Sequence, residues 1–187
     1  TDPIISCVTE NGKVYPMVLK PDLQKAIPEI KTKFLKHTDY AEKTLDELFD
    51  EAAREGMVKR QAVQAATCVL LNDGKSNLTL KPLPLEAQLS PTYGIETLDY
   101  DGDGKLDLVL AGNFFDVLPE IGRYDASFGT VLRGDGKGGF AAVPNAQTGF
   151  FVRGQVRRMR KLTGPGGKTY LILAKNNDAV ELFSFNK

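Results

Sequence analysis

The chain has 187 residues, 42% of them hydrophobic, which is enough for one packed domain and short for two. Its 24 basic and 24 acidic residues cancel, so no net field attracts nucleic acid or an anionic membrane. No apolar run reaches the ~20 residues of a membrane-spanning helix.

The first segment, residues 1–19, predicts a β-hairpin. Strands over residues 4–9 and 14–19 flank Asn11-Gly12, a dipeptide that favours a tight hairpin turn. We expect this hairpin to complete a blade of a larger sheet protein. The chain also opens on Thr-Asp-Pro without Met, which is typical of a piece of a longer protein whose targeting segment lies upstream.

Residues 20–60 predict a helical insertion. Leu23, Ile27, Ile30 and Phe34 fall at helical spacing, and Pro28 either kinks one helix or opens a second. Another helix is expected to begin at a cap on Thr38 or Asp39 and to run through Leu48. A third helical stretch covers residues 51–55 and stops at Gly56.

From residue 61 to the end the pattern is β-rich, with turn signals at short intervals. Short β-rich segments separated by turns favour an antiparallel sheet protein over a fold of alternating helices and strands. The expected strands are 65–71, 78–83, 95–98, 106–111, 130–133, 139–143, 155–162, 170–174 and 179–185.

Two internal matches share almost one offset. Residues 70–78 match 132–140 at an offset of 62, and residues 110–113 match 173–176 at an offset of 63. A β unit of this length with a hairpin in its second half is typical of a propeller blade. The Asp-Gly-Lys sequences at Asp73 and Asp135 then indicate hairpin turns, because each offers one acid where a metal site needs several.

The most informative motif is an acidic loop, residues 99–107. Its four aspartates repel one another unless a cation neutralises them, and Gly104 permits the left-handed backbone of a tight wrap. We expect Asp99, Asp101, Asp103 and Asp107 to bind calcium by their side chains and Lys105 by its carbonyl, with the lysine side chain outward. An EF-hand is excluded because its closing glutamate position is Leu110, in an apolar strand. At an offset of 63 the corresponding loop, 162–170, has no carboxylate.

The hairpin, the DxDxDGxxD loop and the strand ending Leu-Ala-Gly-Asn resemble the FG-GAP or VCBS-type repeats of integrin-α-like β-propellers, over residues 65–185. Residues 89–95, 122–129 and 174–178 are similar to the carboxy-terminal end of large secreted bacterial proteins of the ASPIC/UnbV-associated type. The resemblance implies a mainly β fold with a helical insertion, antiparallel propeller-type blades, and calcium at the acidic loop. About two blades make a partial propeller, whose open strands need the remaining blades of a parent protein, the helices or self-association to cover them.

A non-catalytic, extracytoplasmic module that binds a protein or a glycan is the function that this resemblance implies. The alternative is a polysaccharide hydrolase or lyase, because carboxylates beside an Arg-Tyr pair can do acid–base work on sugars. Its candidate residues are Asp116, Glu120, Arg123, Tyr124 and Asp125, which a turn held by an arginine–carboxylate pair would equally explain.

Several other features favour plain structural roles. The basic stretch 153–161 reads as a solvated strand face without the aromatic partners of nucleic-acid binding. Arg133-Gly134-Asp135 belongs to a hairpin turn, which accounts for it better than adhesion does. Cys7 and Cys68 read as buried thiols, since a disulfide requires that their strands be neighbours. The lone His37 stands among polar residues, which leaves Ser-His-Asp and Cys-His catalysis without a candidate.

Overall fold

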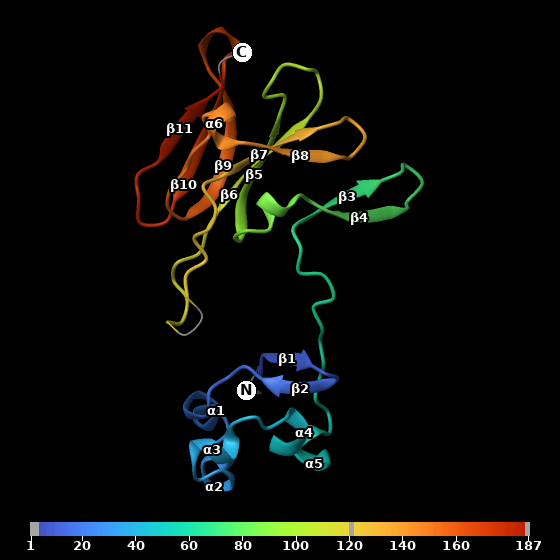
Figure 1. Cartoon of the computed structure of the whole chain (residues 1–187), viewed down its shortest axis with the longest axis vertical. Coiled ribbons are helices and arrows are strands. Elements are labelled where there is room, and N and C mark those ends of the chain that lie inside the picture. The colour runs from blue at the N-terminus through green and yellow to red at the C-terminus, as the bar shows by residue number, and fades with distance from the viewer. Residues whose placement is uncertain (1–3, 120–121, 186–187) are drawn as a thin grey trace. The chain divides into compact units, whose positions relative to one another are not determined.

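The computed structural model describes residues 4–119 and 122–185 of the chain. It consists of two compact units, Thr1–Ala62 and Val63–Lys187 (Figure 1). Of the described residues 34% lie in strands and 19% in helices, and the strands form four antiparallel sheets. The mainly β class predicted from the sequence is therefore confirmed. None of these sheets closes on itself within residues 4–119 and 122–185.

The first unit begins with the predicted hairpin, β1 (Cys7–Glu10) and β2 (Lys13–Pro16). Asn11 and Gly12 take left-handed backbone angles, with φ of 49° and 77°, as a two-residue turn of this kind requires. Glu10 pairs with Lys13 next to the turn. The two strands form a sheet of their own among the described residues.

Five short helices follow, and their apolar residues form the core of the first unit. Pro28 is the N-cap of the second helix, so it separates two helices as expected. The helices are α1 (Lys20–Ala26), α2 (Glu29–Lys33), α3 (His37–Tyr40), α4 (Leu45–Leu48) and α5 (Glu51–Arg54). The buried core residues are Leu23, Ile30, Phe34, Leu45, Leu48 and Phe49.

The prediction of one helix from Thr38 or Asp39 through Leu48 is wrong, because two separate helices, α3 and α4, cover this segment. Glu42 has a φ of 62°, which no helix accommodates. Thr44 then starts α4 with a capping box. Its hydroxyl accepts a bond from the Glu47 amide at 3.3 Å, and the Glu47 carboxylate accepts one from the Thr44 amide at 2.9 Å.

The second unit contains three groups of strands. The first layer is the hairpin of β3 (Cys68–Asn72) and β4 (Leu78–Pro82). The middle sheet has the sequential order β5 (Thr92–Leu98), β6 (Asp107–Gly112), β7 (Thr130–Gly134), β8 (Phe140–Val143). The last sheet comprises β9 (Val156–Thr163), β10 (Thr169–Lys175) and β11 (Glu181–Ser184). The 3₁₀ turn η1 (Leu85–Ala87) and the helical turn α6 (Asn145–Thr148) lie between these groups, and the 3₁₀ turn η2 (Pro165–Gly167) lies between β9 and β10.

The central strands β6 and β7 of the middle sheet are buried on both faces. Successive residues of each strand point to opposite sides. On one face Val109 and Val131 join a core with Met159, Leu171 and Leu173 of the last sheet. On the other face Leu110 and Leu132 form a core with Leu83 and Ala87, against which Val69 of the first layer packs. The second unit is thus a stack of three β layers.

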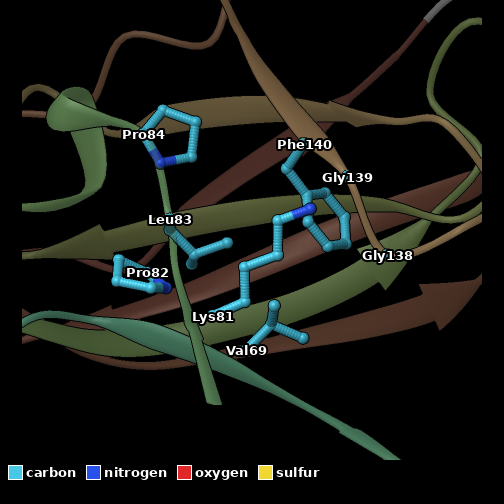
Figure 2. Close-up of a pocket in the computed structure, with 8 residues that line it drawn as sticks. All are labelled: Val69, Lys81, Pro82, Leu83, Pro84, Gly138, Gly139 and Phe140. Carbon is cyan, nitrogen blue, oxygen red and sulfur yellow. The ribbon is translucent and has the colours of Figure 1, made fainter. Parts of the chain in front are cut away.

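The seam between the first layer and the middle sheet leaves a shallow pocket of about 280 Å³. Figure 2 shows Val69 and Lys81 of the hairpin on one side of it, and Phe140 beside Gly138 and Gly139 on the other. Gly138 is required there, since a Cβ on it would lie 2.7 Å from the Leu71 side chain. The residues that line this pocket belong to the packing between the two layers.

The hairpins of the first layer and the middle sheet have the same register. Leu70 lies opposite Leu80 in the first, and Leu132 opposite Ala142 in the second, so each position differs by 62 residues. Their turns also match: the Asp73 carboxylate accepts the Lys75 and Asn77 amides, and Asp135 accepts those of Lys137 and Gly139. These aspartates therefore close turns, as the sequence predicted.

Candidate metal centre

The acidic loop connects β5 to β6 at one end of the middle sheet, and Asp107 is the first residue of β6. Gly102 and Gly104 have φ of 80° and 81°, in the left-handed region that glycine adopts without strain. The prediction for Gly104 is confirmed, and Gly102 serves the same purpose. The loop can therefore turn tightly enough to direct several carboxylates inward.

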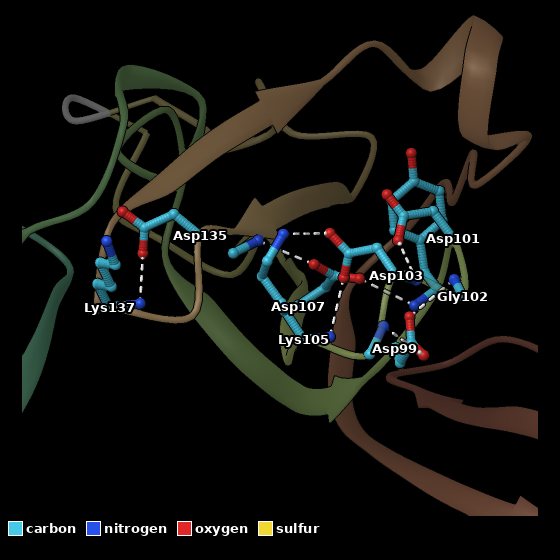
Figure 3. A network of polar contacts seen from close by, with 11 residues as sticks. Asp99, Asp101, Gly102, Asp103, Lys105, Asp107, Asp135 and Lys137 are labelled. Carbon is cyan, nitrogen blue, oxygen red and sulfur yellow. Dashed lines mark hydrogen bonds and ion pairs between the residues drawn. The ribbon is translucent and has the colours of Figure 1, made fainter.

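Three of the four predicted carboxylates come together. One oxygen from each of Asp99, Asp101 and Asp107 lies within 4.8 Å of the others, close enough to share one metal ion (Figure 3). Asp107 is buried, Asp99 half-buried and Asp101 exposed. The cluster is thus anchored on one side and open to solvent on the other.

Backbone amides fix the first ligand. Asp99 Oδ1 accepts a hydrogen bond from the Gly102 amide at 2.7 Å, and Oδ2 accepts one from the Gly104 amide at 3.2 Å. Asp101 Oδ1 accepts the Asp103 amide at 3.2 Å. The loop thus folds around its own carboxylates, and the two glycines make that path available.

Asp107 anchors the site to the sheet. It is fully buried, and its Oδ2 accepts the Tyr100 amide at 2.9 Å while its Oδ1 accepts the Gly134 amide at 2.8 Å. The second bond links the loop to the end of β7. Only glycine fits at position 134, because a Cβ there would lie 2.1 Å from the Leu106 carbonyl oxygen. This partner residue was not recognised from the sequence, and the internal match gives no signal for it, because the position that corresponds to Gly134 is Asn72.

Asp103 departs from the predicted arrangement. The Lys105 ammonium binds Asp103 Oδ2 at 2.8 Å, and the Lys105 amide binds Oδ1 at 2.8 Å. The Lys105 side chain is 45% exposed, so it lies on the outside of the loop as expected, where it forms this ion pair (Figure 3). The same contact lowers the pKa of the Asp103 carboxyl and raises the pKa of Lys105. Asp103 is therefore held by a lysine beside the three-carboxylate cluster.

The residues considered for sugar chemistry are held by other contacts. Asp116 Oδ2 accepts bonds from Asn176 Nδ2 at 3.2 Å and from Gln155 Nε2 at 3.5 Å. The Arg123 guanidinium lies over the Phe115 ring, 5.3 Å from the ring centroid.

The backbones of Tyr124 and Phe114 form a β-bridge, so Tyr124 has a structural role. Asp125 is exposed, and Glu120 lies outside the described residues.

An arginine of the basic stretch is more constrained than the sequence indicated. Arg157 lies between the rings of Tyr93 and Phe114, at 4.7 and 5.2 Å from their centroids. It donates to the Asn113 carbonyl oxygen at 3.0 Å and to Gln155 Oε1 at 2.8 Å. Arg157 therefore helps to join the middle and last sheets. The prediction of a solvated strand face applies to the exposed basic residues around it, such as Arg158 and Arg160.

Both cysteines are free thiols, and burial raises the pKa of Cys7. Within the described part of the chain, the helices are all too short or too polar to cross a lipid bilayer.

Fold and site together define an antiparallel β protein whose acidic loop can hold a metal ion. Comparison with known proteins adds no name to this class: no family model, curated protein or solved structure matches the chain.

Proposed function

We propose that this chain is a calcium-binding, non-catalytic module of propeller-type blades that binds a protein or a glycan outside the cytoplasm. The observation that carries the proposal is the cluster of Asp99, Asp101 and Asp107 on a loop shaped by left-handed glycines. The resemblance to FG-GAP and VCBS repeats and the sequential antiparallel order of the middle sheet support the blade assignment.

Calcium suits this cluster better than a softer metal. The ligands are all oxygens, and calcium accepts several carboxylates in a flexible geometry, whereas zinc and copper favour nitrogen or sulfur. Asp101 is exposed, so waters can complete the coordination shell. Asp103 is the natural fourth carboxylate once a stronger cation than the Lys105 ammonium competes for it.

The proposed ion is structural. It would neutralise the carboxylates of the loop and hold the loop against the start of β6. Asp107 also accepts the Gly134 amide, so the same ion would help to fix the loop to β7. Loops with dissociation constants of about 10⁻⁴ to 10⁻³ M are filled at extracellular calcium levels, which agrees with the proposed location. A partner would then bind to a surface that the ion has made rigid.

Calcium titration followed by thermal melting tests the site. A ligand at one hundred times its dissociation constant adds about 2.7 kcal/mol to the free energy of unfolding, and each kcal/mol raises the melting temperature of such a chain by about 2–4 °C. We expect this rise in the wild type and its loss in Asp101→Ala. Asp125→Ala, which removes an exposed carboxylate elsewhere, should keep it.

An unchanged melting temperature in the wild type would contradict the calcium site. An equal rise with magnesium and calcium would contradict the choice of metal. For the binding role, a glycan array and capture of surface proteins by the calcium-loaded chain provide the test, and failure of both would refute it.

A further inference from the structure

The last sheet leaves one face uncovered. Met159, Leu171 and Leu173 point toward the middle sheet, so the alternating positions Leu162, Ile172 and Leu182 point away from it, as does Arg160 opposite Ile172. Leu162 and Leu182 are 46% and 60% exposed.

Two positions on this face correspond to buried positions in the middle sheet. In the middle sheet Val109 lies opposite Val131, and in the last sheet Ile172 lies opposite Leu182. Val109 and Val131 are 0% and 1% exposed because the last sheet covers them. Ile172 and Leu182 therefore occupy positions that a further layer, stacked on the last sheet, would bury.

The opposite end of the stack has a second uncovered face. Val69 and Leu71 of the first layer point toward the middle sheet, so Leu70, Leu78 and Leu80 point away. These three leucines are 55%, 59% and 49% exposed. Their counterparts at an offset of 62, Leu132, Phe140 and Ala142, belong to the core that faces the preceding layer.

We propose that the chain associates head to tail, with the first-layer hairpin of one copy packing on the uncovered face of the last sheet of another. Leu70, Leu78 and Leu80 of one copy would cover Leu162, Ile172 and Leu182 of the next. The contact continues the interface by which the three layers of one chain already stack, and it requires no metal ion.

Arg158 indicates that a two-stranded hairpin, and not a complete four-stranded layer, packs on the uncovered face of the last sheet. In the middle sheet the position opposite Ala111 is Gly94, and a Cβ there would lie 3.1 Å from both Met159 Cβ and Val156 Cγ1. Glycine thus lets β9 pack closely on β5. In the last sheet the corresponding position, opposite Ala174, is Arg158, which has a long charged side chain in place of the glycine.

The β3–β4 hairpin avoids this obstacle. Its register equals that of β7 and β8, so it represents the half of a sheet that lies away from β5. A copy that docks by this hairpin has no counterpart of β5 in the layer that makes the contact. The proposed occupant is therefore the hairpin of a second copy.

The two faces differ, so the contact is heterologous and adds copies in one direction, as a ring or as a filament. Sedimentation velocity of the whole chain over a concentration series should show mass increasing beyond the monomer. Leu182→Glu and Leu80→Glu should each raise the dissociation constant by about tenfold or more, because each buries a carboxylate in an apolar contact. Leu118→Glu, at an exposed leucine in a loop, is the matched control and should leave it unchanged.

Mixing the two variants distinguishes this geometry from a symmetric dimer. Each variant keeps one intact face, so the mixture should form a one-to-one complex although neither variant associates alone. A wild type that stays monomeric at every concentration, or variants that fail to complement, would overturn the proposal. If Leu182→Glu fails to fold, Leu162→Glu alters the same face and takes its place. All measurements are made in a calcium chelator, so their outcome is independent of the calcium titration.

Discussion

Asp107 and Asp101 show how two aspartates of one loop differ in what they do. Both oxygens of Asp107 accept backbone amides in the interior, whereas Asp101 is exposed and accepts one amide of its own loop. Asp107 is thus needed for the fold and for the proposed ion, and Asp101 mainly for the ion.

This difference predicts that the two alanine substitutions lower the free energy of unfolding by different amounts in the absence of metal. Asp107→Ala leaves the amides of Tyr100 and Gly134 without their acceptor, so we expect a loss of about 3 kcal/mol in the free energy of unfolding. Asp101→Ala should cost less than about 0.5 kcal/mol, as is usual for exposed substitutions. Urea denaturation in a chelator measures both, and equal losses would contradict the assignment.

At the scale of elements, the start of α4 depends on one capping box. Hydrogen bonding by the Thr44 amide, together with the Thr44 hydroxyl and Lys43, lowers the pKa of Glu47 to about 2. Since the unfolded value is about 4.3, the carboxylate stabilises the fold above that pH. The contribution is lost as the pH falls through the folded value.

Thr44→Ala should therefore lower the free energy of unfolding by about 1 kcal/mol near neutral pH. Glu47→Gln should destabilise the first unit at neutral pH, and its difference from the wild type should shrink between about pH 4.3 and pH 2. Chemical denaturation at a series of pH values, followed by circular dichroism, tests both. Glu51→Gln, in the first turn of α5, is the control.

Much of the strand pattern could be predicted, because alternating apolar residues and Asp-Gly or Asn-Gly turns act locally. The hairpins at Asn11-Gly12 and at Asp135 follow from such signals. The break between α3 and α4 was missed because Thr44 shares the apolar spacing of its neighbours, and only its bonds with Glu47 reveal a cap. The hydrogen bond from Gly134 to Asp107 depends on a tertiary contact between residues 27 apart, which no local spacing encodes.

For the whole molecule, separate cores are the decisive feature. The apolar cluster around Ile30 and Leu48 draws only on the first unit, and the two clusters around Val109 and Leu132 draw only on the second. Units with independent cores can unfold independently.

Calorimetry should therefore show two unfolding transitions, and calcium should raise only the one that belongs to the second unit. Leu48→Ala should lower one transition and Leu132→Ala the other, each by the equivalent of about 2–5 kcal/mol, because both leucines are fully buried. A single transition that every one of these changes shifts would show that the two units unfold together.

The bond from Gly134 to Asp107 also gives the protein a built-in spectroscopic reporter. A cation near Asp107 withdraws electron density from the oxygen that the Gly134 amide contacts, so the resonance of that amide proton should move on binding. The amide lies on β7, which is outside the loop, and it would report occupancy without any added label beyond nitrogen-15. Glycine amides occupy a sparse region of such spectra, so one backbone signal could follow the filling of the loop in a mixture with any partner.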